Sequence, residues 1–394
     1  MIFSYNKERE LGENMNIIYF DNSATTRIKT EVLNEMMPFL TTEYGNPSSL
    51  YSIGRKAKKA IENARKQVAE LLNCNPHEIF FTAGGSESDN LALKGFAYAN
   101  REKGNHIITS KIEHHAILET CENLEKQGFE VSYINVDEDG IIKLEELQKA
   151  IKPSTILISV MAANNEIGTI QPIEQIAQIA HSHNITFHTD AVQAAGNMTI
   201  DVTKMGIDML SISGHKIGAP KGIGALYVKD GIKFEKIING GHQEKDKRAG
   251  TENVAGIVGL GKACETANRN MDTHIKYLTK LRDYYISRLQ KEMPDRIRIN
   301  GTMEMRLPGN ANVSFEDANG SELIFKLDEK GICVSSGSAC SSGDSAPSHV
   351  LKAINVPEKY LNSAIRTTFG DNNTFEQIDY FVRVIKNEIL RDGP

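Results

Sequence analysis

A lysine and an aspartate stand at the ends of two predicted strands that follow each other in the chain. Asp190 ends the first strand, and Lys216 follows the second in the stretch Ser213-Gly214-His215-Lys216. A lysine amine can hold an aldehyde cofactor as a Schiff base, and a carboxylate can keep a pyridine nitrogen protonated. The pair is typical of a pyridoxal 5′-phosphate site, with Gln193 placed to donate to the ring oxygen. Taken singly, Lys216 also fits a surface loop and Asp190 a helix cap.

A glycine turn between a strand and a helix could hold the cofactor phosphate. It runs Thr82-Ala83-Gly84-Gly85-Ser86-Glu87-Ser88. Backbone N–H groups and the helix dipole favour an anion at such a turn, and Ser86 adds a hydroxyl. An ordinary strand–turn–helix connection has the same appearance.

Histidines lie between another predicted strand and helix, in Glu113-His114-His115. One imidazole could lie over the cofactor ring and move protons near neutral pH. Neutral helix capping and metal ligation are the alternatives. No Cys/His cluster has the spacing of a zinc site, so we expect no metal.

Five cysteines in 394 residues do not form a disulfide framework, and their odd number leaves room for a working thiol. Cys340 lies in the Ser/Gly-rich stretch Ser335-Ser336-Gly337-Ser338-Ala339-Cys340. Such a stretch makes a poor core, so we expect Cys340 to be exposed and mobile. It could attack sulfur as a thiolate, or it could be an incidental surface cysteine. Cys264 and Cys333 fit core positions.

Arg366 lies in a short apolar strand. A buried arginine needs an anion, and its planar fork suits a substrate carboxylate. A structural ion pair explains the residue equally well.

The pattern around these residues is that of an α/β protein. Short apolar runs alternate with amphipathic stretches through the first two thirds, which favours a mostly parallel sheet with helices on both faces. A helical stretch over 253–291 could link two domains. We expect a large domain over 28–268 and a small domain from 15–27 and 269–394. Strands are predicted at 79–82, 106–109, 156–160, 186–190, 209–212 and 224–228, and helices at 55–72, 86–100, 115–127, 173–183 and 374–390.

Composition excludes several classes of protein. The net charge of −6 shows no basic excess for wholesale nucleic-acid binding. No apolar run approaches the roughly 18 residues of a membrane span, and the start lacks a secretory signal. We therefore expect a cytoplasmic protein that binds neither nucleic acid nor membrane. Residues 1–14 are polar and are expected to be a disordered leader, with Met15 as the natural start.

Together these motifs resemble the cysteine desulfurases of the NifS/IscS type, which are fold-type-I pyridoxal-phosphate enzymes. The resemblance runs from about residue 16 to residue 391, and the motifs in this order are very specific. The matched segments are Tyr19–Thr26, Gly45–Ser49, Phe81–Asn90, Asn164–Gly168, His188–Gln193, Ser213–Lys216, Arg248–Thr251 and Ser335–Cys340.

The resemblance implies a fold with a seven-stranded sheet in the large domain, and it implies roles for single residues. Lys216 would form the Schiff base with the cofactor, Asp190 would pair with the ring nitrogen, and Gln193 would pair with the ring oxygen. His114 would stack on the ring, and Asn165 would lie near the ring oxygen and the substrate. The phosphate would be held by Gly85, Ser86, Ser213 and His215, and by Thr251 from a neighbouring subunit. The last contact implies a homodimer with shared active sites.

The implied reaction converts L-cysteine to L-alanine. Arg366 would bind the substrate carboxylate, Lys216 would move the α-proton, and Cys340 would attack the substrate sulfur and become a persulfide. The sulfur would then pass to an acceptor protein, such as an iron–sulfur scaffold or a tRNA-thiolation enzyme. A selenocysteine lyase or related lyase shares every cofactor residue. A catalytically silent sulfur-carrier or scaffold subunit is the alternative from another class.

The sequence departs from the family pattern at a few positions. Ser86 replaces the usual Thr, and Tyr51 stands where His is common. Lys245-Asp246 replaces the usual Arg-Gly pair, which is expected to alter a backbone or phosphate contact. The sequence ends at Pro394, just after its last predicted helix, whereas many members carry a further tail that docks a scaffold. We expect this difference to bear on the acceptor and not on the chemistry.

Overall fold

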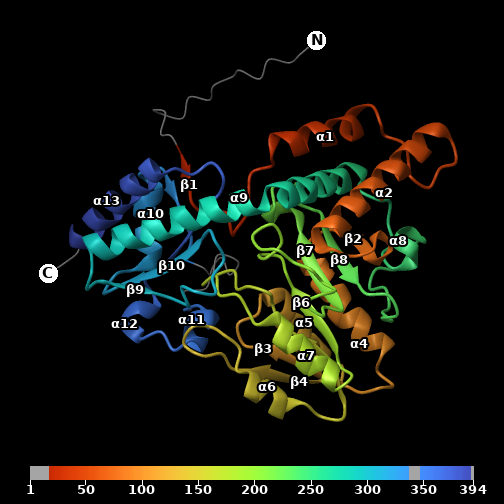
Figure 1. Ribbon diagram of the computed structural model, residues 1–394, viewed down its shortest axis with the longest axis horizontal. Coiled ribbons are helices and arrows are strands. Elements are labelled where there is room, and N and C mark those ends of the chain that lie inside the picture. The colour runs from red at the N-terminus through yellow and green to blue at the C-terminus, as the bar shows by residue number, and fades with distance from the viewer. Residues whose placement is uncertain (1–16, 337–346, 392–394) are drawn as a thin grey trace.

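The computed structural model describes residues 17–336 and 347–391, and a seven-stranded sheet forms its centre (Figure 1). Strand β8 is antiparallel to both of its neighbours, β2 and β7, and all other neighbouring pairs are parallel. The prediction of a mostly parallel seven-stranded sheet is confirmed. In spatial order the strands are β2 (Ile79–Thr82), β8 (Gly224–Val228), β7 (Met209–Ser213), β6 (Thr186–Asp190), β5 (Thr155–Ser159), β3 (His106–Ser110) and β4 (Glu130–Ile134).

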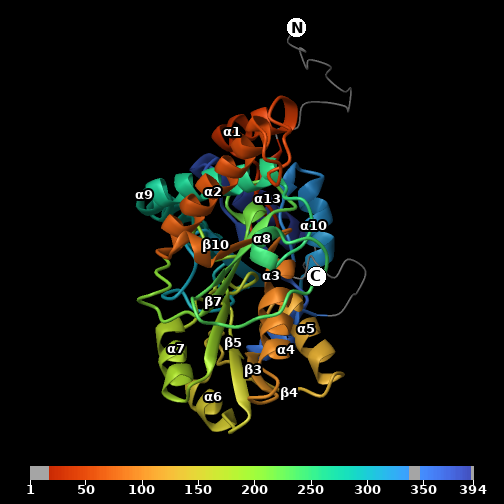
Figure 2. The same cartoon turned by 90° about the vertical axis from the view of Figure 1, so that its right-hand side faces the viewer.

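Helices cover both faces of this sheet, and the strand side chains divide between them. Ile158 and Leu210 pack on the side of α7, whereas their neighbours Leu157 and Met209 pack on the side of α3 to α5. Successive side chains of a strand point to opposite faces, so strands covered on both sides read as continuous apolar runs. Figure 2 shows α7 and the group α3–α5 on opposite sides of the sheet. These helices are α3 (Gly85–Asn90), the π-helical stretch Leu91–Gly95, α4 (Phe96–Ala99), α5 (His115–Glu125) and α7 (Ile173–Ser182).

A second hydrophobic core lies in the C-terminal part of the chain. Phe20, Tyr285, Phe315 and Phe381 are fully buried in it, and Tyr285 stacks on Phe381 with ring centroids 5.3 Å apart. Phe20 comes from the N-terminal segment. The division into a large domain over 28–268 and a small domain from 15–27 and 269–394 stays a prediction. The elements around this core are β1 (Ile18–Tyr19), β9 (Ile297–Ile299), β10 (Asn310–Phe315), β11 (Ile332–Cys333), β12 (Ala364–Thr368), α10 (Gly320–Asp328), α11 (His349–Ala353), α12 (Glu358–Leu361) and α13 (Phe375–Arg391).

One long helix, α9 (Val254–Glu292), belongs to both cores. Leu260 and Cys264 are buried in the core of the large sheet, and Leu281 and Tyr285 in the second core. Asn253 caps the start of α9 by accepting a hydrogen bond from the Gly256 N–H. The long helix predicted over 253–291 is therefore present.

The remaining helices pack at the periphery. Helix α2 matches the predicted helix at 55–72, whereas α1, α6 and α8 were not predicted. Their bounds are α1 (Thr30–Thr41), α2 (Ser52–Leu72), α6 (Leu144–Ala150) and α8 (Gln243–Asp246), and short 3₁₀ turns lie at Pro76–Glu78 and Gly214–Lys216. Across residues 17–336 and 347–391, no helix is both long enough and apolar enough to cross a membrane.

Candidate active site

Asp190 and Lys216 come from the same edge of the sheet. Strands β6 and β7 are parallel neighbours, with Asp190 opposite Ser211, and the turn Gly214–Lys216 follows directly after β7. Asp190 is buried and accepts a hydrogen bond from the Val192 N–H at 2.8 Å. Burial raises the pKa of Asp190, while the Val192 N–H and the positive charge of Lys216 lower it. The predicted pair is therefore brought to one place, with the acid and the amine electrostatically coupled.

The N-terminal segment Asp21–Thr26 lies against this pair. The Lys216 ammonium donates to the backbone oxygens of Ser23 and Ala24, at 2.9 Å for Ala24. The Gln193 side-chain amide donates to the Ser23 oxygen at 3.0 Å. His215 contacts the Thr25 hydroxyl at 3.2 Å. The segment resembles the family in sequence and was not predicted to have a role, yet it contacts several of the predicted cofactor residues.

The glycine turn forms a tight cradle at the start of α3. A Cβ atom on Gly85 would lie 2.6 Å from Val192 Cγ2, so only glycine fits there without a shift. A Cβ atom on Gly84 would project toward the Ser213 hydroxyl at 3.9 Å. The turn and Ser213 therefore face each other, and their role in holding a phosphate stays a prediction. Ser86 is an exposed residue in the first turn of α3.

His114 sits at the N-terminus of α5 and caps it. Its Nδ1 accepts a hydrogen bond from the Ala116 N–H at 3.1 Å, so the proton of the neutral ring is on Nε2. Burial, together with the charges of Lys216, His115 and His349, lowers the pKa of His114 to about 4. His114 therefore caps α5, and this hydrogen bond fixes the tautomer of its ring. The ring is still close enough to Lys216 for the charge of Lys216 to affect its pKa.

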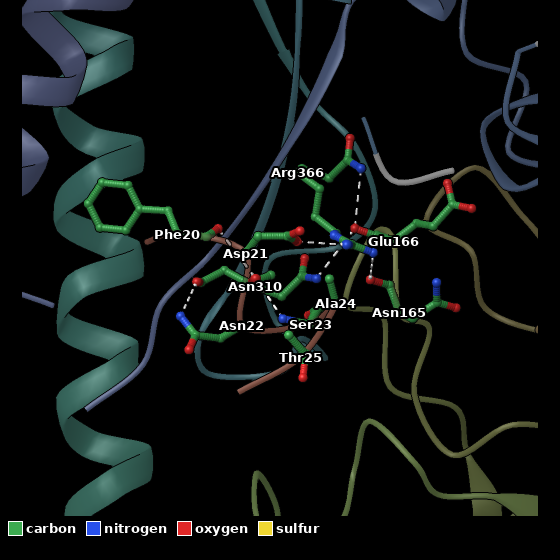
Figure 3. A network of polar contacts seen from close by, with 12 residues as sticks. Phe20, Asp21, Asn22, Ser23, Ala24, Thr25, Asn165, Glu166, Asn310 and Arg366 are labelled. Atoms are coloured by element: carbon green, nitrogen blue, oxygen red, sulfur yellow. Dashed lines mark hydrogen bonds and ion pairs between the residues drawn. The ribbon is translucent and has the colours of Figure 1, made fainter. Parts of the chain in front are cut away.

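Arg366 is buried in β12 and already has an anionic partner (Figure 3). Its Nη2 lies 2.8 Å from Asp21 Oδ1, and its Nη1 donates to the Asn165 backbone oxygen at 3.2 Å. The ion-pair alternative is thus realised by Asp21, which was not predicted. The same guanidinium lies beside Asn165, the other predicted substrate residue.

Thr251 is exposed and follows a strained segment. Glu244, Lys245 and Asp246 have φ of 45°, 56° and 64°, in the left-handed region that disfavours non-glycine residues. Buried Glu244 holds the segment through a two-pronged pair with Arg65, at 2.8 Å on each side, and it accepts from the Phe81 N–H at 2.9 Å. Lys245 and Asp246, which replace the Arg-Gly pair usual in the family, therefore lie where glycine would relieve backbone strain. The predicted contact of Thr251 with a second subunit stays a prediction.

Further buried acids next to the predicted residues were missed by sequence analysis. Asp89 follows the glycine turn, Glu113 precedes His114, and Glu166 follows Asn165. Burial raises the pKa of each carboxyl. Asp89 and Glu166 lie in segments that carried the family resemblance, and Glu113 adjoins the candidate residue His114. A charged residue in such a position was the available signal.

Cys340 lies outside the described residues, so its place relative to Lys216 stays a prediction. The four cysteines that are described, Cys74, Cys121, Cys264 and Cys333, are free thiols, with Cys264 and Cys121 buried and Cys333 half-buried. Within the described ranges, no group of three or more His, Cys, Asp or Glu side chains could hold a metal ion.

A cavity of about 1230 Å³ contacts Lys216 and Gln193. Its other walls include Asn197, His274 and Tyr277, and they include neither His114 nor Arg366. The cavity is bordered by α9, and we do not assign it to the substrate.

Comparison with known proteins gives consistent matches. The family model for class-V aminotransferases matches residues 18–381. A cysteine desulfurase IscS of Clostridium botulinum is 53% identical over 370 residues, which cover 93% of each chain. A solved structure of a NifS-like protein has a TM-score of 0.89 at 40% identity and covers 95% of this chain and 99% of its own. The solved structure of SspA in complex with cysteine has a TM-score of 0.77 at 39% identity and covers 89% of this chain and 98% of its own. Sequence, fold and the Lys216–Asp190 arrangement together show that the chain belongs to the class-V aminotransferase family, among relatives named as cysteine desulfurases.

Proposed function

We propose that the chain is a pyridoxal-phosphate-dependent cysteine desulfurase that passes sulfur from L-cysteine to Cys340. The observation that carries the proposal is the placement of Asp190 and Lys216 at the ends of adjacent strands, beside a glycine cradle. The family and its desulfurase relatives support the same activity.

The residues present fit pyridoxal phosphate. A buried carboxyl suits a protonated ring nitrogen, and the space in front of Gly84 and Ser213 suits a phosphate at a helix N-terminus. Lys216 would hold the aldehyde, Asp190 the ring nitrogen and Gln193 the ring oxygen, with Ser86, Ser213 and His215 on the phosphate. When bound, the cofactor supplies an electron sink for the carbon atoms of the substrate.

Lys216 is the group proposed to move a proton, and His114 is proposed to donate a hydrogen bond. Released from the cofactor, the Lys216 amine would take the proton from the substrate Cα, and the backbone oxygens of Ser23 and Ala24 lie within reach of its Nζ. The neutral His114 ring carries its proton on Nε2, the nitrogen that does not cap α5. The neutral His114 ring is therefore suited to donate a hydrogen bond from Nε2.

Arg366 is proposed to bind the substrate carboxylate together with Asn165. Asp21 balances the buried charge of Arg366 when no substrate is bound. A substrate carboxylate would share the guanidinium with Asp21.

Cys340 is proposed to accept the sulfur as a nucleophile. Its thiolate attacks the β-sulfur of the substrate, an S–S bond forms, and the Cβ–S bond breaks with its electron pair left on carbon. Protonation of that carbon and return of the α-proton from Lys216 to Cα would give L-alanine, and the enzyme would keep a Cys340 persulfide. Two equivalents of an added thiol then release sulfide and are oxidised to a disulfide.

Two alternatives predict different results. A selenocysteine lyase would use the same cofactor residues, but it would not need the Cys340 thiol as a carrier of the released atom. A silent carrier subunit would not bind the cofactor, which the intact Lys216, Asp190 and glycine turn argue against.

The test is a comparison of purified wild type, Cys340→Ala and the control Cys333→Ala. Each is given L-cysteine and a thiol reductant, and sulfide, alanine and the visible absorbance of the cofactor are measured. We expect Cys340→Ala to lose sulfide release and to keep the cofactor absorbance, while Cys333→Ala stays active. Unchanged turnover in Cys340→Ala would exclude the persulfide route. Failure of the wild type to bind the cofactor would exclude both the cysteine desulfurase and the selenocysteine lyase.

We also propose a homodimer with shared sites. Helix α1 packs on α9 through Val32 and Met36, but its other face and the segment after it remain apolar and exposed. Leu40 is 58% exposed and Leu50 is 88% exposed. Apolar patches of this kind mark protein interfaces, and a second copy that brings Thr251 to the phosphate would cover them.

The dimer is tested by light scattering after size-exclusion chromatography. We expect Leu40→Glu to shift the protein toward monomer and to weaken cofactor binding. Phe325→Glu is the matched control, because Phe325 is 72% exposed on α10, away from α1. A wild-type protein that runs as a monomer would overturn the proposal.

The acceptor of the sulfur is proposed to be another protein in the cytoplasm, either an iron–sulfur scaffold or a tRNA-thiolation enzyme. Incubation of the enzyme with ³⁵S-labelled cysteine and each purified acceptor tests this step. Labelled sulfur should move to the physiological acceptor and should not move when Cys340 is replaced by Ala.

A further inference from the structure

Two described residues that follow the Cys340 stretch contact the candidate site. The Ser348 hydroxyl donates to Glu166 Oε2 at 2.5 Å, and both residues are buried. His349 Nε2 contacts the Glu113 backbone oxygen at 3.0 Å. Glu166 follows Asn165 in the chain and Glu113 precedes His114, so each contact is one residue away from a predicted site residue.

The described residues before Cys340 are held in the same way. The Ser335 N–H donates to the Arg366 backbone oxygen at 3.2 Å, and the Arg366 N–H donates to the Ser335 oxygen at 2.6 Å. Ser335 is five residues before Cys340, and Ser348 is eight residues after it. The chain on both sides of Cys340 is therefore tied to elements that carry Arg366, Asn165 and His114.

Glu166 is a firm anchor because its own backbone is fixed. Its N–H donates to the Asn164 side-chain oxygen at 2.9 Å, and its backbone oxygen accepts from the side-chain amides of Asn310 and Asn312 at 3.3 and 3.2 Å. The charges of Arg366 and His115 and the Ser348 hydroxyl favour its ionised form, against the burial that raises its pKa.

Ser348 performs two tasks at once. Its hydroxyl oxygen accepts from the Val350 and Leu351 N–H groups at 3.1 and 3.3 Å, which caps α11, while its hydrogen goes to Glu166. The start of α11 is thereby fixed to the segment that carries Asn165.

We propose that Ser348 and Glu166 are positioning residues for the sulfur-transfer step. The proposal rests on the proposed desulfurase function. By fixing Ser348 and the start of α11 to the segment that carries Asn165, the pair would hold one end of the chain segment that carries Cys340. The Ser348 hydroxyl is used on Glu166, Val350 and Leu351, so we expect cofactor loading and substrate binding to change little when it is altered.

The experiment separates positioning from helix capping by three substitutions at one position. Ser348→Thr keeps the hydroxyl and both tasks, whereas Ser348→Ala loses both. Ser348→Asp keeps a good N-cap for α11 but places a second carboxylate against Glu166. Asn319→Ala is the matched control, because exposed Asn319 caps α10 through the N–H groups of Ser321 and Glu322.

The measurements are the cofactor absorbance, KM for L-cysteine, kcat for alanine release, and the persulfide on Cys340 by mass spectrometry in a single turnover. We expect Ser348→Asp and Ser348→Ala to slow persulfide formation and kcat by on the order of tenfold to a hundredfold, the range for a misplaced reacting group. KM and cofactor absorbance should stay near wild type, and Ser348→Thr and Asn319→Ala should behave as wild type.

The inference is overturned if Ser348→Asp forms the persulfide at the wild-type rate, or if its loss appears in KM or cofactor binding. It is also overturned if Asn319→Ala slows persulfide formation equally. A wild-type enzyme that makes no alanine or no Cys340 persulfide would instead overturn the proposed function, so the two failures are distinguishable.

Discussion

The buried Arg65–Glu244 pair should be a main support of the segment that leads to Thr251. The change to make is Glu244→Gln, which keeps the shape of the side chain and removes its charge. Glu244 makes two contacts of 2.8 Å with Arg65 and one of 2.9 Å with the Phe81 N–H, and both charged side chains are almost fully buried.

The expected loss follows from the charge left behind. Removing one partner of a buried ion pair typically costs about 3–5 kcal/mol, because the other charge stays buried without compensation. The Gln side-chain oxygen can still accept one hydrogen bond, and Arg65 also donates to the Ile79 backbone oxygen at 2.7 Å. We therefore expect the lower end of the range, about 3 kcal/mol of unfolding free energy.

The assay is urea denaturation followed by circular dichroism, at a fixed protein concentration because association would add to apparent stability. Glu130→Gln is the control, since Glu130 pairs with Lys152 on the exposed surface and its loss should not change the urea midpoint measurably. Affinity for pyridoxal phosphate should fall in Glu244→Gln, because Phe81 leads directly into the glycine turn.

The reasoning is refuted if Glu244→Gln lowers the unfolding free energy by less than about 1 kcal/mol, the size of an exposed pair. If the urea m-value changes together with the midpoint, the substitution has altered the native or the denatured state itself. In that case the double variant Arg65→Met, Glu244→Leu tests whether the uncompensated charge of Arg65 causes the loss of stability. If the buried charge is the cause, this double variant regains stability over Glu244→Gln.

Three further predictions concern single residues. Burial lowers the pKa of His188 to about 3, from 6.5 in the unfolded chain, so the unfolded state binds an extra proton between these pH values. The free energy of unfolding should therefore fall by up to about 1.4 kcal/mol per pH unit as the pH drops through this window. The urea midpoints of His188→Gln at pH 5 and pH 7 should differ less than those of wild type. Asp246→Gly should raise the melting temperature in a thermal scan, because glycine accepts the φ of 64° without strain; a lower melting temperature would mean that the Asp246 contacts with Lys236 and His242 outweigh the strain. Gly85→Ala should weaken pyridoxal-phosphate binding by at least about tenfold in an equilibrium titration, because its Cβ would meet Val192 at 2.6 Å and displace the turn; unchanged affinity would contradict the cradle.

The sequence was most informative where chemistry and strand ends coincide. Asp190 and Lys216 end or follow apolar runs, and parallel strands bring such ends to one edge, so their proximity followed from the pattern. The glycine turn before α3 was readable for the same reason, since a strand, glycines and a helix are local features.

Contacts between residues far apart in the chain could not be predicted. Asp21 and Arg366 are 345 residues apart, and Arg65 and Glu244 are 179 apart, so no local pattern joins them. Arg366 alone left the choice between substrate and ion pair open for this reason. Helix α1 was missed because both of its faces carry apolar residues and Pro38 lies within it, which hides the helical period.

Helix α9 has a mechanical consequence for the enzyme. Its 39 residues extend for about 58 Å and enter both hydrophobic cores without an intervening loop. A rotation of the part that carries Arg366 against the part that carries Lys216 would have to bend this rod and disturb two sets of packed side chains. Helix α9 therefore makes the connection between the two hydrophobic cores rigid. The distance between Lys216 and Arg366 is fixed by this connection before the substrate binds.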